Sequence, residues 1–210
     1  ATRHVLELAA VAGAPVAAEV LARAAETDAG ALARVLALLR VAHLLRSSGG
    51  GDGAVECYHD RVRQAVLAGL APLERQRCHE RLALALEASA HPDAEALALH
   101  WQGAGQRERA ARHASEAANQ AAQALAFDRA VRLYRQALEL GGGEDPVRLR
   151  VGLGDALANG GRGAEAALAY LSACEAPGAS AALKLDCQRR AADEYLRSGH
   201  ADEGLKALKA

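Results

Sequence analysis

Apolar residues recur every three or four positions along most of the chain, and this spacing predicts helices with one buried face. The pattern covers residues 2–12, resumes around 16–21 and returns over about 28–42, where Asp28 is suited to cap the helix. Gly13-Ala-Pro15 interrupts it after the first of these segments. Three helices are therefore predicted in the first part of the chain.

Two short extended runs follow, on either side of Gly49-Gly-Gly-Asp-Gly53. Runs of this kind around a glycine-rich tip predict a β-hairpin over about residues 43–58. The tip lacks the Lys-Ser/Thr ending of a phosphate-binding P-loop and precedes a strand, so we interpret it as a hairpin turn. Three helices followed by a hairpin is the element order of a winged-helix domain, which we expect over residues 1–70.

A helical pattern restarts directly after the hairpin, at Tyr58-His59-Asp60. Asp60 is predicted to cap this helix, because its carboxylate can accept amide hydrogens of the first turn. An imidazole at His59 can donate to a phosphate, and the start of a helix favours anions. The alternative is a local role, in which His59 packs and Asp60 holds the turn. From the residues alone, both interpretations stay open.

Two further helices are predicted after this one. The first covers about residues 72–89, with Pro72 in its opening turn, and the second runs from about residue 93 to 103. The leucines that the first should bury are Leu73, Leu82, Leu84 and Leu86. Trp101 is interpreted as a core side chain, since aromatics fill the space between helices. A ligand-stacking role beside His100 is the alternative.

Residues 71–210 carry an internal repeat of helix pairs, clearest at 107–141, 146–176 and 180–210. Small residues recur where two helices would touch, with a large side chain nearby. The matching residues are Phe127, Ala130, Tyr134 and Ala137; Leu153, Gly154, Leu157, Gly163, Ala166, Tyr170 and Ala173; and Ala191, Ala192, Tyr195, Gly204 and Leu208. This pattern matches the tetratricopeptide repeat and predicts a mainly α-helical, TPR-like superhelix. A weaker unit leaves the register near residues 94–124 open.

The composition agrees with packed helices and excludes several classes. Hydrophobic residues make up 51% of the chain and aromatic residues 3%, which argues against a sandwich or barrel of β-branched and aromatic strands. The net charge of −1 gives no support to nucleic-acid binding, which usually requires a basic field. No apolar run approaches the ~20 residues that span a bilayer, and no signal peptide is recognisable. A cytoplasmic protein without a membrane partner is expected.

Candidate chemistry is sparse. The four cysteines form no Cys-x-x-Cys pair and are expected to be buried free thiols. The eight histidines show no metal-ligand spacing, so we interpret them as partly exposed helix residues. Cys78 and His79 are neighbours on a predicted helix and point to different sides, which excludes a nucleophile–base pair. No catalytic residue and no metal site is predicted.

The segment Tyr58-His59-Asp60-Arg-Val-Arg-Gln-Ala65 resembles the "HDR-(V/I)-(R/Q)-x-A" stretch that follows the ATPase module of bacterial STAND-class signalling ATPases. These are AAA-like or NACHT-like proteins, often fused to Ser/Thr kinase, adenylyl cyclase or LuxR-type output domains. Tyr58-His59-Asp60 is also similar to the Met-His-Asp motif in the winged-helix domain of NOD-like and plant resistance ATPases, with Tyr in place of Met.

The resemblance implies a regulatory and scaffold segment with no enzymatic activity of its own. In the family the histidine contacts the β-phosphate of ADP and helps hold the closed state. His59 and Asp60 are thus the implied nucleotide-sensing residues, and ATP or ADP is the implied ligand of a longer protein. The chain contains no P-loop, Walker B carboxylate or sensor arginine. The ATPase is therefore expected upstream, and no cofactor is expected in this segment.

Partners and boundaries follow from the same resemblance. The implied partners are the upstream ATPase domain and a protein partner or inducer on the concave face of the repeats. The absence of methionine and the helical pattern at the C-terminal end predict that the chain is a fragment.

Two alternatives come from other functional classes. A DNA-binding winged-helix regulator would need a dense basic set on its third helix, where only Arg34 and Arg40 are available, so DNA is not the expected partner. A stand-alone TPR adaptor that shares only its modules with the ATPases is the other alternative.

Overall fold

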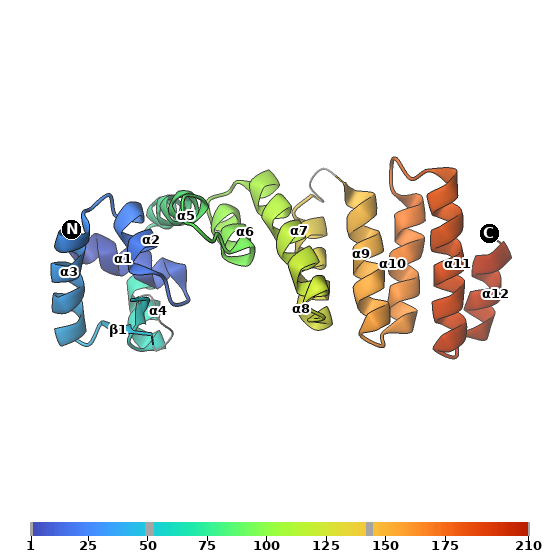
Figure 1. Cartoon of the computed structure of the whole chain (residues 1–210), viewed down its shortest axis with the longest axis horizontal. Helices are drawn as coiled ribbons and strands as arrows, with labels where there is room; N and C mark the ends of the chain where they lie inside the picture. The colour runs from blue at the N-terminus through green and yellow to red at the C-terminus, as the bar shows by residue number, and fades with distance from the viewer. Residues whose placement is uncertain (1, 49–52, 142–144, 210) are drawn as a thin grey trace. The chain divides into compact units, whose positions relative to one another are not determined.

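The computed structural model describes residues 2–48, 53–141 and 145–209, and the chain is mainly helical over these ranges. Its contacts divide it into two compact units, Ala1–Gln106 and Arg107–Ala210, whose elements are labelled in Figure 1. The boundary expected near residue 70 falls inside the first unit. Each unit has its own packing and is described separately.

The three helices predicted at the start of the first unit are present. They are α1 (Thr2–Ala12), α2 (Ala18–Ala24) and α3 (Ala29–Val41). Asp28 caps α3 as predicted, because its carboxylate accepts the Ala31 amide hydrogen at 2.8 Å. The buried face of α3 carries Leu32, Leu36 and Leu39, which is the spacing expected of an amphipathic helix.

The predicted hairpin is also present, as strands β1 (Leu45–Ser47) and β2 (Val55–Cys57). They pair antiparallel, with Leu45 opposite Cys57 and Ser47 opposite Val55. Residues 49–52 of the predicted glycine-rich tip lie outside the described ranges. Val16, between α1 and α2, exchanges two backbone hydrogen bonds of 2.9 Å with Val55. The hairpin is therefore joined to the helices by backbone bonding as well as by side-chain packing.

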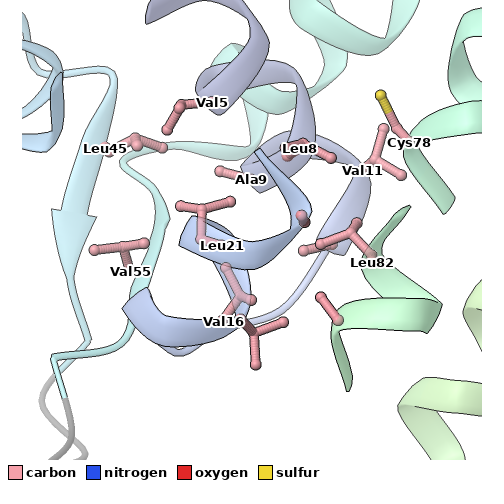
Figure 2. Close-up of a cluster of buried hydrophobic side chains, with 14 of the residues drawn as sticks. Val5, Leu8, Ala9, Val11, Val16, Leu21, Leu45, Val55, Cys78 and Leu82 are labelled. Carbon is pink, nitrogen blue, oxygen red and sulfur yellow. The ribbon is translucent and has the colours of Figure 1, made fainter. Parts of the chain in front are cut away.

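A cluster of buried hydrophobic side chains joins the helices and the hairpin of the first unit (Figure 2). Leu8 and Leu21 of the opening helices meet Leu45 and Val55 of the hairpin in this core, and all four are essentially inaccessible to water. Leu82, from a helix after residue 70, completes the same cluster. Fully burying a leucine contributes roughly 1.5–3 kcal/mol, so this cluster accounts for much of the cohesion of the unit.

Three more helices complete the first unit: α4 (Asp60–Ala68), α5 (Pro72–Glu87) and α6 (Ala94–Gly103). The burial predicted for α5 is partly wrong, because Leu73 is 57% and Leu84 is 50% exposed. Leu82 is buried as predicted, and Cys78 and Ala85 are buried with it on the side of the helix that faces α1 and α2. Leu84 follows Leu82 by only two residues, so the two side chains point to different sides of the helix and only one of them can face the core.

The capping role predicted for Asp60 is also wrong. His59 occupies the N-cap position with extended backbone, and its side chain makes no capping hydrogen bond. Asp60 is the first helical residue, and its carboxylate accepts a 2.6 Å hydrogen bond from Gln64 Nε2, one turn ahead. Its charge still lies in the first turn of α4, where the helix dipole favours an anion.

The second unit consists of helix pairs, as the repeat predicts. The pairs are α7 (Arg107–Gln123) with α8 (Phe127–Glu139), α9 (Pro146–Asn159) with α10 (Gly163–Glu175), and α11 (Ala181–Arg197) with α12 (Ala201–Lys209). Residues 142–144 of the predicted glycine-rich insertion lie outside the described ranges. Each helix packs closely on the next along the chain, so the unit is built from neighbour contacts.

Small residues allow the aromatic side chains of the repeat to enter between helices. A Cβ atom on Gly154 of α9 would lie 2.5 Å from the Tyr170 ring of α10, and one on Gly152 would lie 2.7 Å from the Tyr134 ring of α8. Both tyrosines are buried. The predicted roles of small and aromatic residues at these positions are therefore confirmed by their contacts.

Candidate functional site

The junction between β2 and α4 places Tyr58, His59 and Asp60 side by side at the surface of the first unit. The amide of Tyr58 donates to the Leu44 carbonyl at 3.0 Å, which extends the hairpin pairing by one residue. The Tyr58 ring contacts the rings of His43 and His59 edge-on, with centroid distances of 5.4 and 4.7 Å. Tyr58 is half-buried and His59 is exposed, so tyrosine supports the histidine from beneath.

The junction opens onto a surface pocket of about 300 Å³. Besides His59, its lining includes two arginines, Arg46 of β1 and Arg63 of α4, and the carboxylates of Glu56 and Asp60. Arg46 Nε lies 2.9 Å from Glu56 Oε1, across the hairpin. The pocket therefore combines cationic and anionic groups that partly neutralise each other.

Arg63 also fixes the position of α4. Its Nε donates to the Ala10 carbonyl near the end of α1 at 3.1 Å, and a guanidinium nitrogen lies 3.7 Å from Asp60 Oδ1. The guanidinium passes close to Gly13, whose backbone has φ +71° and where a Cβ atom would lie 3.1 Å from it. Gly13 thus serves two needs, a left-handed turn and room for an arginine.

The first turn of α4 is only partly available to a ligand. The amides of Val62 and Arg63 already donate to the His59 carbonyl at 3.0 and 3.3 Å. The side-chain donors that line the pocket are the His59 imidazole and the two guanidinium groups, and the earlier amides of the turn, those of Asp60 and Arg61, have no intrahelical acceptor. Cys57 also lines the pocket, and burial raises the pKa of its thiol, which makes it a poor nucleophile.

Sequence reasoning found His59 and Asp60 but missed the two arginines. The structure places all four side chains around one pocket. Arg63 could have been found as the residue one helical turn after Asp60. Arg46 could not, because its place beside Glu56 depends on the register of the hairpin, and short apolar runs do not specify a register.

A second polar network lies within the helix pairs of the second unit. Asp155 Oδ1 of α9 accepts hydrogen bonds from the Tyr170 hydroxyl at 2.7 Å and from Arg190 of α11 at 2.9 Å. Arg190 Nε also lies 2.7 Å from Asp186 Oδ2, and its guanidinium lies 5.8 Å from the centre of the Tyr170 ring. Burial and the bond to Asp155 raise the Tyr170 pKa, so the hydroxyl remains a hydrogen-bond donor.

The first helix pair repeats part of this arrangement. The Tyr134 hydroxyl of α8 donates to Asn119 Oδ1 of α7 at 2.8 Å. Tyr134 and Tyr170 occupy matching repeat positions, as do Asn119 and Asp155. Each of the two tyrosines thus buries its ring between helices and directs its hydroxyl to a polar residue on the preceding helix. Asp155 and Arg190 give the second and third pairs a charged surface feature, half-exposed to water.

His79 and His100 form a pair between α5 and α6 that sequence reasoning missed. Their Nδ1 atoms lie 3.0 Å apart, and Gly103 makes room for the His79 ring. His100 is only 3% exposed, so its prediction as a partly exposed residue is wrong. Burial, together with the nearby His79, lowers the pKa of His100 to about 4. Trp101 is buried as predicted, and its Nε1 donates to Glu87 at 3.0 Å.

The described parts of the chain contain neither a metal-binding cluster nor a membrane-spanning helix. Over the described ranges, no three or more His, Cys, Asp or Glu side chains are grouped to hold a metal ion. In the same parts of the chain, the helices are too short or too polar to cross a membrane. All four cysteines are free thiols, two of them fully buried.

Comparisons with known proteins identify a similar fold only at low similarity. No protein-family model and no curated protein matches the chain. The solved structure "MamA MSR-1 C2" is 22% identical, covers 62% of this chain and 83% of its own, and has a TM-score of 0.39. "MamA AMB-1 C2221" has the same identity and covers 62% of this chain and 85% of its own, with a TM-score of 0.40. At these values the similarity carries no functional argument.

Proposed function

We propose that this chain is a regulatory and scaffold segment of a signal-transduction ATPase. In this proposal the first unit senses the nucleotide state of an ATPase domain, and the second unit binds a protein partner. The observation that carries the proposal is the pocket at the β2–α4 junction, where His59, Arg46 and Arg63 surround a space suited to a phosphate group.

The arrangement of the first unit supports a winged-helix assignment. The hairpin follows three helices, and the segment between the first two helices pairs with the second strand through Val16 and Val55. In this assignment the hairpin is the wing, and the β2–α4 junction with the Tyr58-His59-Asp60 motif follows its second strand. The motif and the element order are independent features of the chain, and they support the same assignment.

In this proposal the pocket takes the phosphate end of a nucleotide. At about 300 Å³ the pocket lies at the lower end of the range for small-molecule sites. Its donors are the cationic and imidazole groups that phosphate oxygens prefer. The base and sugar would have to be held by the proposed ATPase domain. ADP would supply negative charge at this junction, and His59 would be the residue that donates a hydrogen bond to it.

The switch would work through differential affinity. A ligand shifts a two-state protein only as far as it binds one state more tightly than the other. Because Arg63 ties the start of α4 to the end of α1, a phosphate held by His59 would favour the one orientation in which α4, β2 and the ATPase domain meet. Loss of that contact would release the orientation and raise the signalling output.

The helix pairs support the second half of the proposal. Close packing of small residues against Tyr134 and Tyr170 leaves polar side chains such as Arg190 at the surface, which is typical of TPR-like scaffolds that bind proteins. The DNA-binding alternative receives less support, because the exposed side of α3 carries Leu38 and Val41, which are 63% and 81% exposed.

The test is His59→Ala in the longer protein that includes the ATPase domain. We expect faster release of bound ADP and a higher basal output, because the mutation removes one charge-assisted donor, a contact worth about 1.5–3 kcal/mol. His91→Ala is the matched control, since His91 is an exposed histidine elsewhere in the first unit. Unchanged ADP retention and output in His59→Ala would contradict the sensing role.

A further inference from the structure

Two cysteines, Cys174 and Cys187, lie on the consecutive and packed helices α10 and α11. Cys174 lies at the end of α10 and is half-buried, whereas Cys187 lies in α11 and is 1% exposed. The turn between the two helices separates them along the chain. The sequence did not predict this pairing, because the spacing of the two residues matches no redox or metal motif.

Their contacts place the two thiols on facing sides of the helices. Cys174 Sγ lies 3.4 Å from the Tyr170 carbonyl of its own helix and 3.5 Å from the Lys184 carbonyl of α11. Lys184 lies one helical turn before Cys187, so this contact directs the Cys174 thiol onto the face of α11 that carries Cys187. The nearby Cys174 thiol is also one of the groups that raise the pKa of Cys187, which agrees with this placement.

We propose that Cys174 and Cys187 form a redox-sensitive dithiol, which a peroxide oxidises to an intramolecular disulfide linking α10 to α11. The two thiols differ in exposure, so they would react in different steps. Cys174 is accessible from solvent and reacts first, while the buried Cys187 can be reached only by its neighbour and acts as the resolving thiol. The other two cysteines, Cys57 and Cys78, lie in the first unit and take no part.

The reaction is balanced with hydrogen peroxide as the oxidant. The Cys174 sulfur attacks one peroxide oxygen, the O–O bond breaks, and the products are a sulfenic acid and one water. The Cys187 sulfur then attacks the sulfenic sulfur, the S–O bond breaks, and the leaving hydroxide takes up the thiol proton as a second water. Two thiols are oxidised to one disulfide, and one peroxide is reduced to two waters.

The environment makes this a slow, pH-dependent reaction. Burial raises the pKa of the Cys174 thiol above its usual value. Burial and the adjacent Cys174 raise the pKa of Cys187 to about 11. Because the thiolate is the attacking species, we expect the oxidation rate to rise with pH, by up to about tenfold per unit near neutrality. Such a pair responds to sustained oxidant and not to brief exposure.

The disulfide would constrain the surface that carries the Asp155 network. Tyr170 lies one turn before Cys174 on α10, and Arg190 lies one turn after Cys187 on α11. Both side chains contact Asp155. Linking the helices at the cysteines would therefore hold these groups in one relative position and raise the unfolding temperature of the oxidised chain.

The test treats the purified 210-residue chain with hydrogen peroxide and counts free thiols. We expect the count to fall from four to two, the mass to fall by about 2 Da for two lost hydrogens, and peptide mapping to find the link between Cys174 and Cys187. Dithiothreitol should restore all four thiols. A link between two chains, a link that involves Cys57 or Cys78, or no loss of thiols would overturn the proposal.

Two variants separate the pair from general cysteine oxidation. Cys187→Ser should abolish the intramolecular link and leave Cys174 as a sulfenic acid that dimedone labels. Cys78→Ser is the matched control, since Cys78 is equally buried but lies in the first unit, and it should keep the link. If a variant folds poorly, peptide mapping of the oxidised, unmodified chain still decides whether the Cys174–Cys187 link forms.

Discussion

His100 is an ionisable side chain in the interior of the first unit, and its protonation should set the stability of the chain at mildly acidic pH. Its Nδ1 faces His79 Nδ1 at 3.0 Å, so a bond between them requires that at least one ring be neutral there. Burial opposes the charged form, and Arg75 adds positive charge near His79. Protonation of His100 is therefore costly in the folded state and free in the unfolded one.

The sign of the effect follows from the two pKa values. The pKa of His100 is about 4 when folded and about 6.5 when unfolded, so the unfolded chain binds more protons between these values. The free energy of unfolding should be unaffected by this group above pH 6.5. It should fall by about 3 kcal/mol as pH is lowered from 6.5 to 4. Urea unfolding measured across this range checks the expectation.

A non-titrating variant isolates this histidine from the carboxylates. His100→Asn keeps a polar group toward His79 but cannot gain a proton, so the fall in stability between pH 6.5 and 4 should be much smaller. His91→Asn, at an exposed position, should keep the fall seen in the unmodified chain. Equal pH dependence in both variants would show that His100 is not the group responsible.

At the scale of elements, helix pairs are held together by glycines that admit tyrosine rings. Gly154→Ala should destabilise the second unit, because the added Cβ would lie 2.5 Å from Tyr170. Overpacking of this kind costs about 1–3 kcal/mol, against a gain of about 1 kcal/mol in helix propensity. We expect a net loss of up to about 2 kcal/mol in the free energy of unfolding measured in urea.

Gly69→Ala is the matched control for this helix contact. Gly69 has ordinary helical backbone, and a Cβ there would meet its nearest atoms only at 3.6 Å. The free energy of unfolding of the Gly69→Ala chain should be unchanged or slightly higher than that of the unmodified chain. A Gly154→Ala chain as stable as the control would mean that Tyr170 can move aside, and that the glycine is not required for packing.

At the scale of the whole molecule, the first unit should need α5 to fold. Cys78, Leu82 and Ala85 of α5 belong to the core formed by α1–α3 and the hairpin. A chain of residues 1–70 would expose that core, losing roughly 1.5–3 kcal/mol for Leu82 alone. A chain of residues 1–106 should unfold cooperatively in urea, whereas residues 1–70 should show no cooperative transition. Equal cooperativity would place the boundary near residue 70 instead.

The second unit carries the protein-binding half of the proposal, and its architecture was the most predictable part of the chain. The ends of the helix pairs matched the repeat closely, because each repeat is a local unit whose contacts are with its neighbours.

The candidate site was less predictable. His59 and Asp60 could be found from a local motif, but Arg46 joins them only through the pairing of two strands.

What the sequence determined by itself is the set of elements and the repeat. Helical spacing, capping residues and small residues at fixed intervals act within a few turns of chain, so they can be read without knowing the fold. The tertiary structure alone decided the burial of His100, the exposure of Leu84 and the meeting of Cys174 with Cys187. These features depend on which face of each helix packs against a part of the chain that is distant in the sequence. Close packing of the whole core determines that face.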